Sequence, residues 1–170
     1  MFEHWKKRRA HWERMVHKRG ADILKSANMQ KEKKFLQHGK VSVYTHSVRV
    51  AVLSLFLAEL LRVKVNEEAM MRGALLHDYF LYDWHDKNRE NYQKLHGFYH
   101  PGIALKNARK EYHLTRREED IIKKHMWPLT VVPPLCREAW VVTAADKYCS
   151  LLETLKIRKR PGRARVGVAK

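Results

Sequence analysis

The sequence has few of the residues that mark disulfide-rich, secreted or membrane-spanning proteins. Its two cysteines, Cys136 and Cys149, are too few for a disulfide framework, and no signal-peptide pattern opens the chain. The longest apolar run, Val50 to Leu61, has 12 residues and contains Ser54 and Glu59, whereas a membrane-spanning helix needs about 20 apolar residues. We therefore expect a cytoplasmic protein without a membrane span.

Acidic residues are scarce relative to basic ones. The chain has 35 Lys and Arg against 18 Asp and Glu, which gives a formal net charge of +17. This excess favours anionic partners such as nucleotide phosphates, nucleic acid or acidic surfaces, but it does not identify a substrate. With 170 residues, 45% of them hydrophobic, the composition is that of one globular domain.

Glycine and proline are also scarce, and the apolar residues between them recur at three- and four-residue spacing. This pattern predicts an all-α fold, a helical bundle of about six to eight helices, with no good candidate for a β-strand. A basic amphipathic helix is expected at residues 4–18 and a second helix at 21–36. A loop at 37–40 then leads to a helix that carries His46 on its inward, apolar face.

Capping residues locate two of the later helices. Asn66 is a good N-cap for a helix that ends in the apolar residues immediately before His77. Thr115 with Glu118 matches a capping box, and the helix that it begins is expected to end at His125. Both helices therefore end at a histidine, a residue type that can bind a metal.

The remaining segments have weaker signals. Residues 79–99 mix aromatic and charged side chains without a clear period, so we expect a long loop or short helices over a pocket. Pro101 suits the first turn of a helix that runs to about residue 113. A last helix is expected at 137–155, with an apolar stripe formed by Trp140, Val141, Ala144, Ala145, Tyr148 and Leu151 or Leu152.

These elements divide the chain into three regions. Residues 1–39 are expected to form a basic helical extension that packs on the core, and residues 40–155 the main domain. Residues 156–170 are basic and contain glycine and proline, so we expect a disordered tail.

Six residues of metal-binding type occur in a fixed order, each near an end or on the inner face of a predicted helix. One inward-facing histidine is more often a hydrogen-bonded core residue than a ligand. Four histidines with two carboxylates, however, favour a site for two first-row transition metals, and coordination would compensate the buried carboxylates. The six residues are His46, His77, Asp78, His100, His125 and Asp146.

The order His, His-Asp, Asp resembles that of the HD-domain superfamily of metal-dependent phosphohydrolases, over about residues 40–155. The additional His100 and His125 look like the extra ligands of its two-metal branch. That branch includes the HD-GYP cyclic-dinucleotide phosphodiesterases and the bacterial HD-type diadenosine tetraphosphate hydrolases, and the chain is most similar to the second group in size and ligand pattern. The matching segments are Tyr44-Thr45-His46-Ser47, Ala74-Leu75-Leu76-His77-Asp78 and Ala144-Ala145-Asp146-Lys147.

The resemblance implies a binuclear metal centre. One metal would be held by His46, His77, Asp78 and Asp146. The other would be held by Asp78, His100 and His125, so that Asp78 bridges the two ions. Imidazoles and carboxylates suit divalent iron or manganese first, with nickel, cobalt or zinc as alternatives. A metal-bridging water loses a proton near neutral pH, and the hydroxide would hydrolyse a phosphate ester or phosphoanhydride of a nucleotide or dinucleotide.

The chain departs from parts of the family pattern. Met126 follows His125 where the cyclic-dinucleotide enzymes have a second consecutive histidine, and the Gly-Tyr-Pro signature of that group is absent. Cyclic di-GMP is therefore not the expected substrate. The continuation Tyr79-Phe80-Leu81 after the His-Asp pair also lacks the basic residue found close behind that pair in many relatives.

Five residues outside the metal ligands are candidates for substrate contact or proton transfer. His96 precedes His100 by one helical turn if that stretch is helical, and could act as a general acid. Lys147 and Lys124 adjoin metal ligands and could contact a phosphate, with Lys147 also a candidate catalytic residue. Tyr82 and Trp127 could form an aromatic wall for a base. A solvated surface lysine and a core aromatic residue are the simpler interpretations.

Two other functions remain open from the sequence alone. In the first, one metal serves a nucleoside-monophosphate phosphatase, and His100 and His125 are structural. In the second, the chain is a nucleic-acid-binding protein with a structural metal site, and its basic helix at 4–18 and basic tail at 156–170 contact phosphates.

Overall fold

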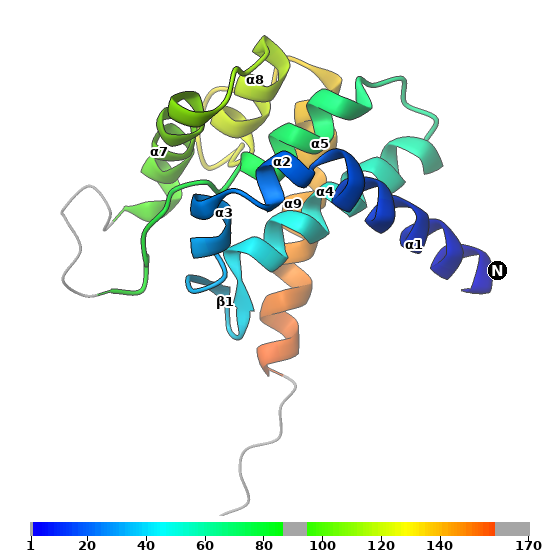
Figure 1. Ribbon diagram of the computed structural model, residues 1–170, viewed down its shortest axis with the longest axis horizontal. Helices are drawn as coiled ribbons and strands as arrows, with labels where there is room; N and C mark the ends of the chain where they lie inside the picture. Colours follow the sequence, from blue (N-terminus) through cyan, green and yellow to red (C-terminus); the bar gives the residue numbers. More distant parts are fainter. Residues whose placement is uncertain (1, 87–94, 159–170) are drawn as a thin grey trace, which may run out of the picture.

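The computed structural model describes residues 2–86 and 95–158, in which eight helices and one two-stranded antiparallel sheet are found (Figure 1). The prediction of an all-α fold with six to eight helices is confirmed. The helices are α1 (Phe2–Arg19), α2 (Ala21–Leu24), α3 (Ala27–Lys31), α4 (Val43–Leu60), α5 (Glu67–Leu76), α7 (His96–Glu111), α8 (Arg116–Lys124) and α9 (Arg137–Arg158). The strands are β1 (Leu36–His38) and β2 (Val41–Ser42).

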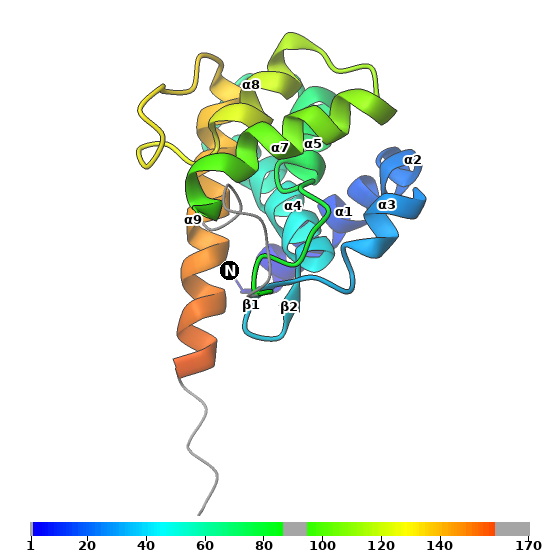
Figure 2. The ribbon, with the colours of Figure 1, turned by 90° about the vertical axis from the view of Figure 1, so that its left-hand side faces the viewer.

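Helix α4 is the central element of the fold, because it packs against α1, α5 and α9. It is long and apolar enough to cross a membrane by length and composition, but 56% of it is buried inside the protein, as in the core helix of a soluble protein. Helix α8 packs against α5, α7 and α9. Figure 2 shows α7 and α8 together at the end of the molecule away from the β1–β2 hairpin.

The β1–β2 hairpin corrects the prediction of a loop at 37–40 and of no strands. Gly39 takes a left-handed backbone conformation with φ 62°, which allows the chain to reverse there. Ser42, the last residue of β2, then caps α4, and its side chain accepts a hydrogen bond from the Thr45 amide at 3.2 Å. Strands of three and two residues are too short to show a two-residue period in the sequence.

The helix predicted at 21–36 is also wrong, because it is two short helices. Ser26 stops α2 and begins α3, since its hydroxyl accepts a hydrogen bond from the Met29 amide at 3.2 Å. This capping preference of serine outweighs the continuous helical pattern around it.

Helix α7 begins at His96, five residues before the expected start at Pro101. Pro101 therefore lies inside the helix, where it has no N–H to donate to the carbonyl four residues earlier. Residues 79–86 are non-helical, as expected for a loop, whereas 96–99 belong to α7. Residues 87–94 of the expected loop lie outside the described residues.

The predicted caps of α5 and α8 are confirmed. The Asn66 side chain accepts a hydrogen bond from the Ala69 amide at 2.9 Å. At α8, Thr115 and Glu118 form both hydrogen bonds of the capping box, and His125 is the C-cap residue. The two helices therefore end where His77 and His125 follow.

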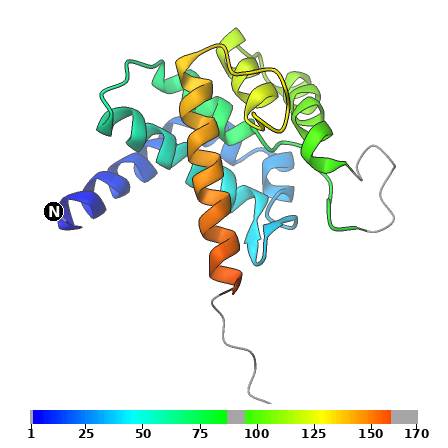
Figure 3. The same ribbon diagram turned by 180° about the vertical axis from the view of Figure 1, so that it is seen from behind.

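The apolar stripe expected on α9 is largely wrong. Trp140, Tyr148 and Leu151 are 42%, 54% and 57% exposed. The buried face is formed by smaller residues, namely Ala139, Val142, Ala145 and Cys149, which let α9 approach its neighbours closely. Helix α9 lies across the outside of the bundle (Figure 3) and continues to Arg158, so 156–158 are helical and not part of a disordered tail. The rest of that tail, 159–170, lies outside the described residues.

Candidate metal centre

All six predicted ligands meet in the interior of the protein, although they come from five helices or helix ends. His46 lies in the first turns of α4, His77 and Asp78 follow α5, and His125 caps α8. His100 and Asp146 lie within α7 and α9. None of the six is more than 6% exposed.

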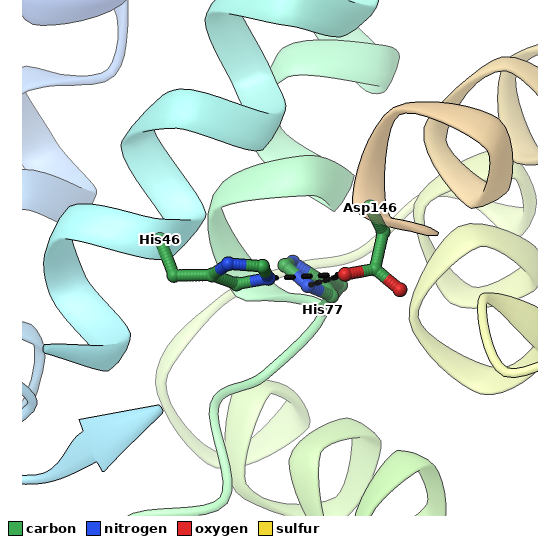
Figure 4. A group of neighbouring side chains, drawn as sticks. All are labelled: His46, His77 and Asp146. Atoms are coloured by element: carbon green, nitrogen blue, oxygen red, sulfur yellow. Dashed lines mark hydrogen bonds and ion pairs between the residues drawn. The ribbon is translucent and has the colours of Figure 1, made fainter. Parts of the chain in front are cut away.

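One part of the cluster, here called the Asp146 side, consists of His46, His77 and Asp146 (Figure 4). The carboxylate oxygen Oδ1 of Asp146 lies 3.0 Å from His46 Nε2 and 3.7 Å from His77 Nε2. Three helices of distant sequence position thus present one carboxylate and two imidazole nitrogens to a common point.

The other part, here called the His125 side, consists of His100 and His125, and Asp78 lies between the two sides. Asp78 Oδ2 is 3.3 Å from His77 Nε2 and 3.8 Å from His46 Nε2. Its second oxygen, Oδ1, is 3.2 Å from His100 Nε2 and 3.5 Å from His125 Nε2. Each oxygen of this carboxylate therefore faces one side, as a bridging ligand requires.

The four imidazoles share one orientation, with Nδ1 bonded outward and Nε2 turned toward the centre. Three Nδ1 atoms lie 2.7–2.9 Å from backbone carbonyl oxygens, those of Ala74, His96 and Ile122. The fourth, His46 Nδ1, lies 3.0 Å from Glu153 Oε2. Because these oxygens only accept, every Nδ1 carries the proton, and a neutral ring then offers its Nε2 lone pair inward. This arrangement is typical of metal-binding histidines.

The His125 side contains a contact that neutral imidazoles alone do not explain. His100 Nε2 and His125 Nε2 are 2.8 Å apart, and both rings donate through Nδ1. Two inward lone pairs would repel at that distance, so a proton or a metal cation between them is needed.

The pKa values of the site differ between its two sides. Burial alone would lower the pKa of His46, but its hydrogen bonds to Asp146 and Glu153 raise that pKa to about 9. Burial and the neighbouring His77 and His100 lower the pKa of His125 to about 3. Burial alone would raise the pKa of Asp78, but the facing His77 and His100 hold it well below its usual range.

The donor set fits divalent transition-metal ions. Two buried atoms, His77 Nε2 and Asp78 Oδ1, have no hydrogen-bond partner among the described residues, and metal coordination would satisfy both. Two groups of donor atoms lie within 4.8 Å of one another, His46 with His77 and Asp146, and His77 with Asp78 and His125. His77 belongs to both groups. His100 Nε2 lies 3.2 Å from Asp78 Oδ1 and 2.8 Å from His125 Nε2, so these distances are compatible with the division that the family resemblance implied.

His96 and Tyr82 lie beside the His125 side. The His96 ring stacks on His100 with centroids 4.4 Å apart, and it also stacks on Trp84 at 4.9 Å. Tyr82 Oη is 2.8 Å from His96 Nδ1, which fixes the orientation of that ring. The structure thus brings the predicted proton donor and one predicted aromatic residue next to a metal ligand.

The other three candidates have partners that bear on their predicted roles. Lys124 pairs with Asp120 at 2.8 Å, so contact with a phosphate would require this ion pair to open. Trp127 packs edge-on against Trp140 with centroids 4.9 Å apart. Lys147 is exposed, and its Nζ lies 3.4 Å from the backbone oxygen of His125, next to the metal centre.

Two buried polar residues at the site escaped the sequence analysis. Glu153 lies seven residues after Asp146, two turns along the same helix face, and this spacing could have indicated it. It also accepts a hydrogen bond from Arg49 at 2.9 Å. Gln37, whose amide donates to Asp78 Oδ2 at 2.7 Å, carries no signal of a metal site in the sequence.

Comparison with known proteins adds one match. The family model described as HD domain matches residues 43–151, which include all six candidate ligands. No curated protein and no solved structure matches the chain.

Proposed function

The chain belongs to the HD-domain family, and from this premise we propose that it is a two-metal phosphohydrolase of nucleotides or dinucleotides. Members of this family are generally metal-dependent phosphohydrolases. The proposal adds the metal count, the substrate class and a cytoplasmic location. Diadenosine tetraphosphate and similar dinucleotide polyphosphates are the first substrates to test.

One observation carries the two-metal proposal, namely the approach of His100 Nε2 to His125 Nε2 at 2.8 Å with both rings donating through Nδ1. A cation bound there removes the repulsion, and a second cation on the Asp146 side would share Asp78 with it. The two oxygens of Asp78 already face the two sides separately.

The protein residues then have distinct roles. His46, His77 and Asp146 would hold one ion, His100 and His125 the other, and Asp78 both. Such ions lower the pKa of coordinated water and neutralise charge on phosphate oxygens when they are bound. Glu153 and the three backbone carbonyls keep Nδ1 protonated, so each Nε2 stays available as a ligand.

Residues beside the His125 side supply the substrate contacts in this proposal. His96 is placed to give a proton to the leaving oxygen, with its ring orientation set by Tyr82. Lys147 would contact a phosphate, and Trp84 offers an aromatic face for a base. The net charge of +17 favours substrates with several phosphates, and it also leaves nonspecific contact with nucleic acid as a second use of the basic termini.

The test is hydrolysis of a nucleotide panel by protein purified without chelator, together with its metal content. We expect close to two metal equivalents per chain and turnover of dinucleotide polyphosphates, both abolished by Asp78→Ala because that residue serves both sides. His113→Ala, which changes an exposed histidine outside the cluster, should keep both. Unchanged turnover in Asp78→Ala would contradict the proposal.

A one-metal nucleoside-monophosphate phosphatase is the second candidate. It is favoured by the sharing of His77 between the two donor groups. A single ion bound to His77 could take its other ligands from either group. In that case the protein would contain one metal equivalent that His100→Ala does not remove, and monophosphates would be the best substrates.

A further inference from the structure

Gln37 reaches the metal centre from outside the region that matches the family. It belongs to β1 and precedes residue 43, where the match begins. Its side chain is 8% exposed, and Nε2 donates to Asp78 Oδ2 at 2.7 Å. An ionised carboxylate oxygen only accepts, so the amide nitrogen, and not the amide oxygen, faces Asp78.

The hairpin directs Gln37 inward by an irregularity in its pairing. Leu36 pairs with Ser42 and His38 with Val41, and the register shifts between Leu36 and His38, where Gln37 lies. Gln37 is the buried residue of β1, between the exposed Leu36 and the half-buried His38. Irregularities of this kind turn a side chain away from the regular alternation of a strand, and they are frequent next to functional sites.

The same segment also holds the backbone that follows Asp78. Glu32, which is 1% exposed, accepts a hydrogen bond from the Leu81 amide at 3.1 Å. Leu81 has a left-handed backbone conformation with φ 61°, which is unfavourable for a leucine and needs support from its surroundings. The extension therefore contacts both the side chain of Asp78 and the turn behind it.

The direction of the Gln37 hydrogen bond matters for metal binding. Asp78 has to present Oδ2 to the Asp146 side and Oδ1 to the His125 side at the same time. A donor fixed on Oδ2 limits rotation of the carboxylate and favours its ionised form, which both sides need.

We infer that Gln37 is a positioning residue of the metal centre, which holds the Asp78 carboxylate in its two-sided orientation through the buried Gln37–Asp78 hydrogen bond. This inference rests on the proposed function. It means that the N-terminal extension, residues 1–39, contributes to metal binding through Gln37.

The test is a cobalt titration of the metal-free full chain, followed by visible absorption and elemental analysis. Gln37→Met is close in size but has no donor, and we expect it to weaken cobalt binding on both sides by about 10- to 100-fold. The matched control is Gln30→Met, which removes a glutamine of the same extension whose amide donates to the Leu24 carbonyl. The control should bind cobalt within about twofold of the wild type, because its amide bonds a backbone group of α2.

Each outcome decides between the possibilities. A Gln37→Met protein with wild-type cobalt affinity and spectrum would overturn the inference alone. Wild-type protein that takes up no cobalt would overturn the proposed function and this inference together. The unfolding temperature of the metal-free variants shows whether a loss of affinity reflects a damaged fold, since a positioning role predicts a larger affinity deficit than Gln30→Met at equal stability.

A second measurement serves if Gln37→Met does not fold. In the wild-type chain, the side-chain amide resonances of Gln37 should shift when zinc binds, because their acceptor becomes a ligand. The corresponding resonances of Gln30 should stay in place. An unshifted Gln37 amide at full zinc occupancy would overturn the inference.

Discussion

The Asp146 side of the metal centre uses a carboxylate to orient one of its histidines, whereas the His125 side uses backbone carbonyls alone. On the Asp146 side, a carboxylate, Glu153, accepts from His46 Nδ1, and a second carboxylate, Asp146, lies 3.0 Å from Nε2 of the same ring. On the His125 side, both rings are oriented by backbone carbonyls, and their Nε2 atoms face one another at 2.8 Å. A carboxylate therefore orients His46, whereas backbone carbonyls orient His77 and both rings of the His125 side.

This difference determines how each side would respond to protons. Without metal, the carboxylates raise the pKa of His46 to about 9, so a proton occupies the place of a cation. The pKa of His125 is lowered to about 3, and this ring is neutral at physiological pH. A metal must displace the proton of His46 on the Asp146 side, whereas on the His125 side His125 itself is already a neutral ligand.

The largest expected effect is the loss of bound metal from one side at a time. Asp146→Ala removes a ligand from the Asp146 side, and His125→Ala removes one from the His125 side, so each should cost about one metal equivalent of two. Elemental analysis and the cobalt spectrum measure both. If either variant loses both metals at a saturating metal concentration, the two sides do not bind metal independently, which would contradict the division of the site.

A smaller effect is expected from the residue behind His46. Glu153→Ala removes the acceptor of His46 Nδ1 and leaves Arg49 without its partner, so it should weaken metal binding on the Asp146 side by about 10- to 100-fold. Binding on the His125 side should stay within about twofold. Glu67→Ala is the control, because Glu67 is exposed and pairs with Arg19 at the surface. Equal weakening of both sides would contradict the division.

The ligands were predictable because each has a local signal. The caps of α5 and α8 locate the helix ends that precede His77 and His125, and the apolar face of α4 places His46 inside. Their combination with Asp146 resembled a known family, which the match over 43–151 then showed. The ends of α5 and α8 depend on a few neighbouring residues, and for this reason the sequence located them well, whereas the start of α7 was misplaced.

The failed helix at 21–36 reflects a local cap at Ser26, but other failed predictions depend on contacts between segments. On α9 both the large residues such as Trp140 and Tyr148 and the small residues such as Ala145 and Cys149 recur at helical spacing, so periodicity alone does not choose the buried face. Close packing against α4 selects the small residues. Gln37 is turned inward by a hairpin that depends on Gly39, and no local pattern indicates its contact with Asp78.

The pH dependence of metal binding should differ between the two sides. The pKa of His46 is raised to about 9 in the metal-free protein, so below pH 9 binding on the Asp146 side must release that proton. Despite its burial, the pKa of His77 is also held well above its usual value, by Asp78 and Asp146. The apparent affinity of the Asp146 side should therefore rise by about tenfold or more per pH unit between pH 7 and 9, more steeply than that of the His125 side. Calorimetric titration of His125→Ala and Asp146→Ala in buffers of different ionisation enthalpy measures the protons released by each side.

The same shift has a consequence for stability. The folded pKa of His46 lies above its usual value of 6.5, so its contribution to the free energy of unfolding of the metal-free protein is fully present below pH 6.5 and is lost as pH rises through 9. If His125→Ala and Asp146→Ala released equal numbers of protons on metal binding, this result would contradict the charge difference between the two sides.

The smallest expected effect concerns Glu32, which supports the turn behind Asp78 and belongs to neither side. Burial raises the pKa of Glu32 to about 8 from its usual 4.5, despite the hydrogen bond from the Leu81 amide, so the folded protein favours the neutral carboxyl. In the metal-free protein its contribution to stability is fully present below pH 4.5 and is lost as pH rises through 8.

Glu32→Gln stays neutral and can still accept from Leu81. The unfolding temperature of the wild type should therefore fall relative to this variant by roughly 5 °C between pH 5 and 9, and Glu13→Gln, at an exposed position of α1, should follow the wild type. Parallel curves of unfolding temperature against pH for all three proteins would contradict this prediction, because they would show that ionisation of the buried Glu32 carboxyl does not lower stability. The electrostatic difference would then concern only the Asp146 side and the His125 side.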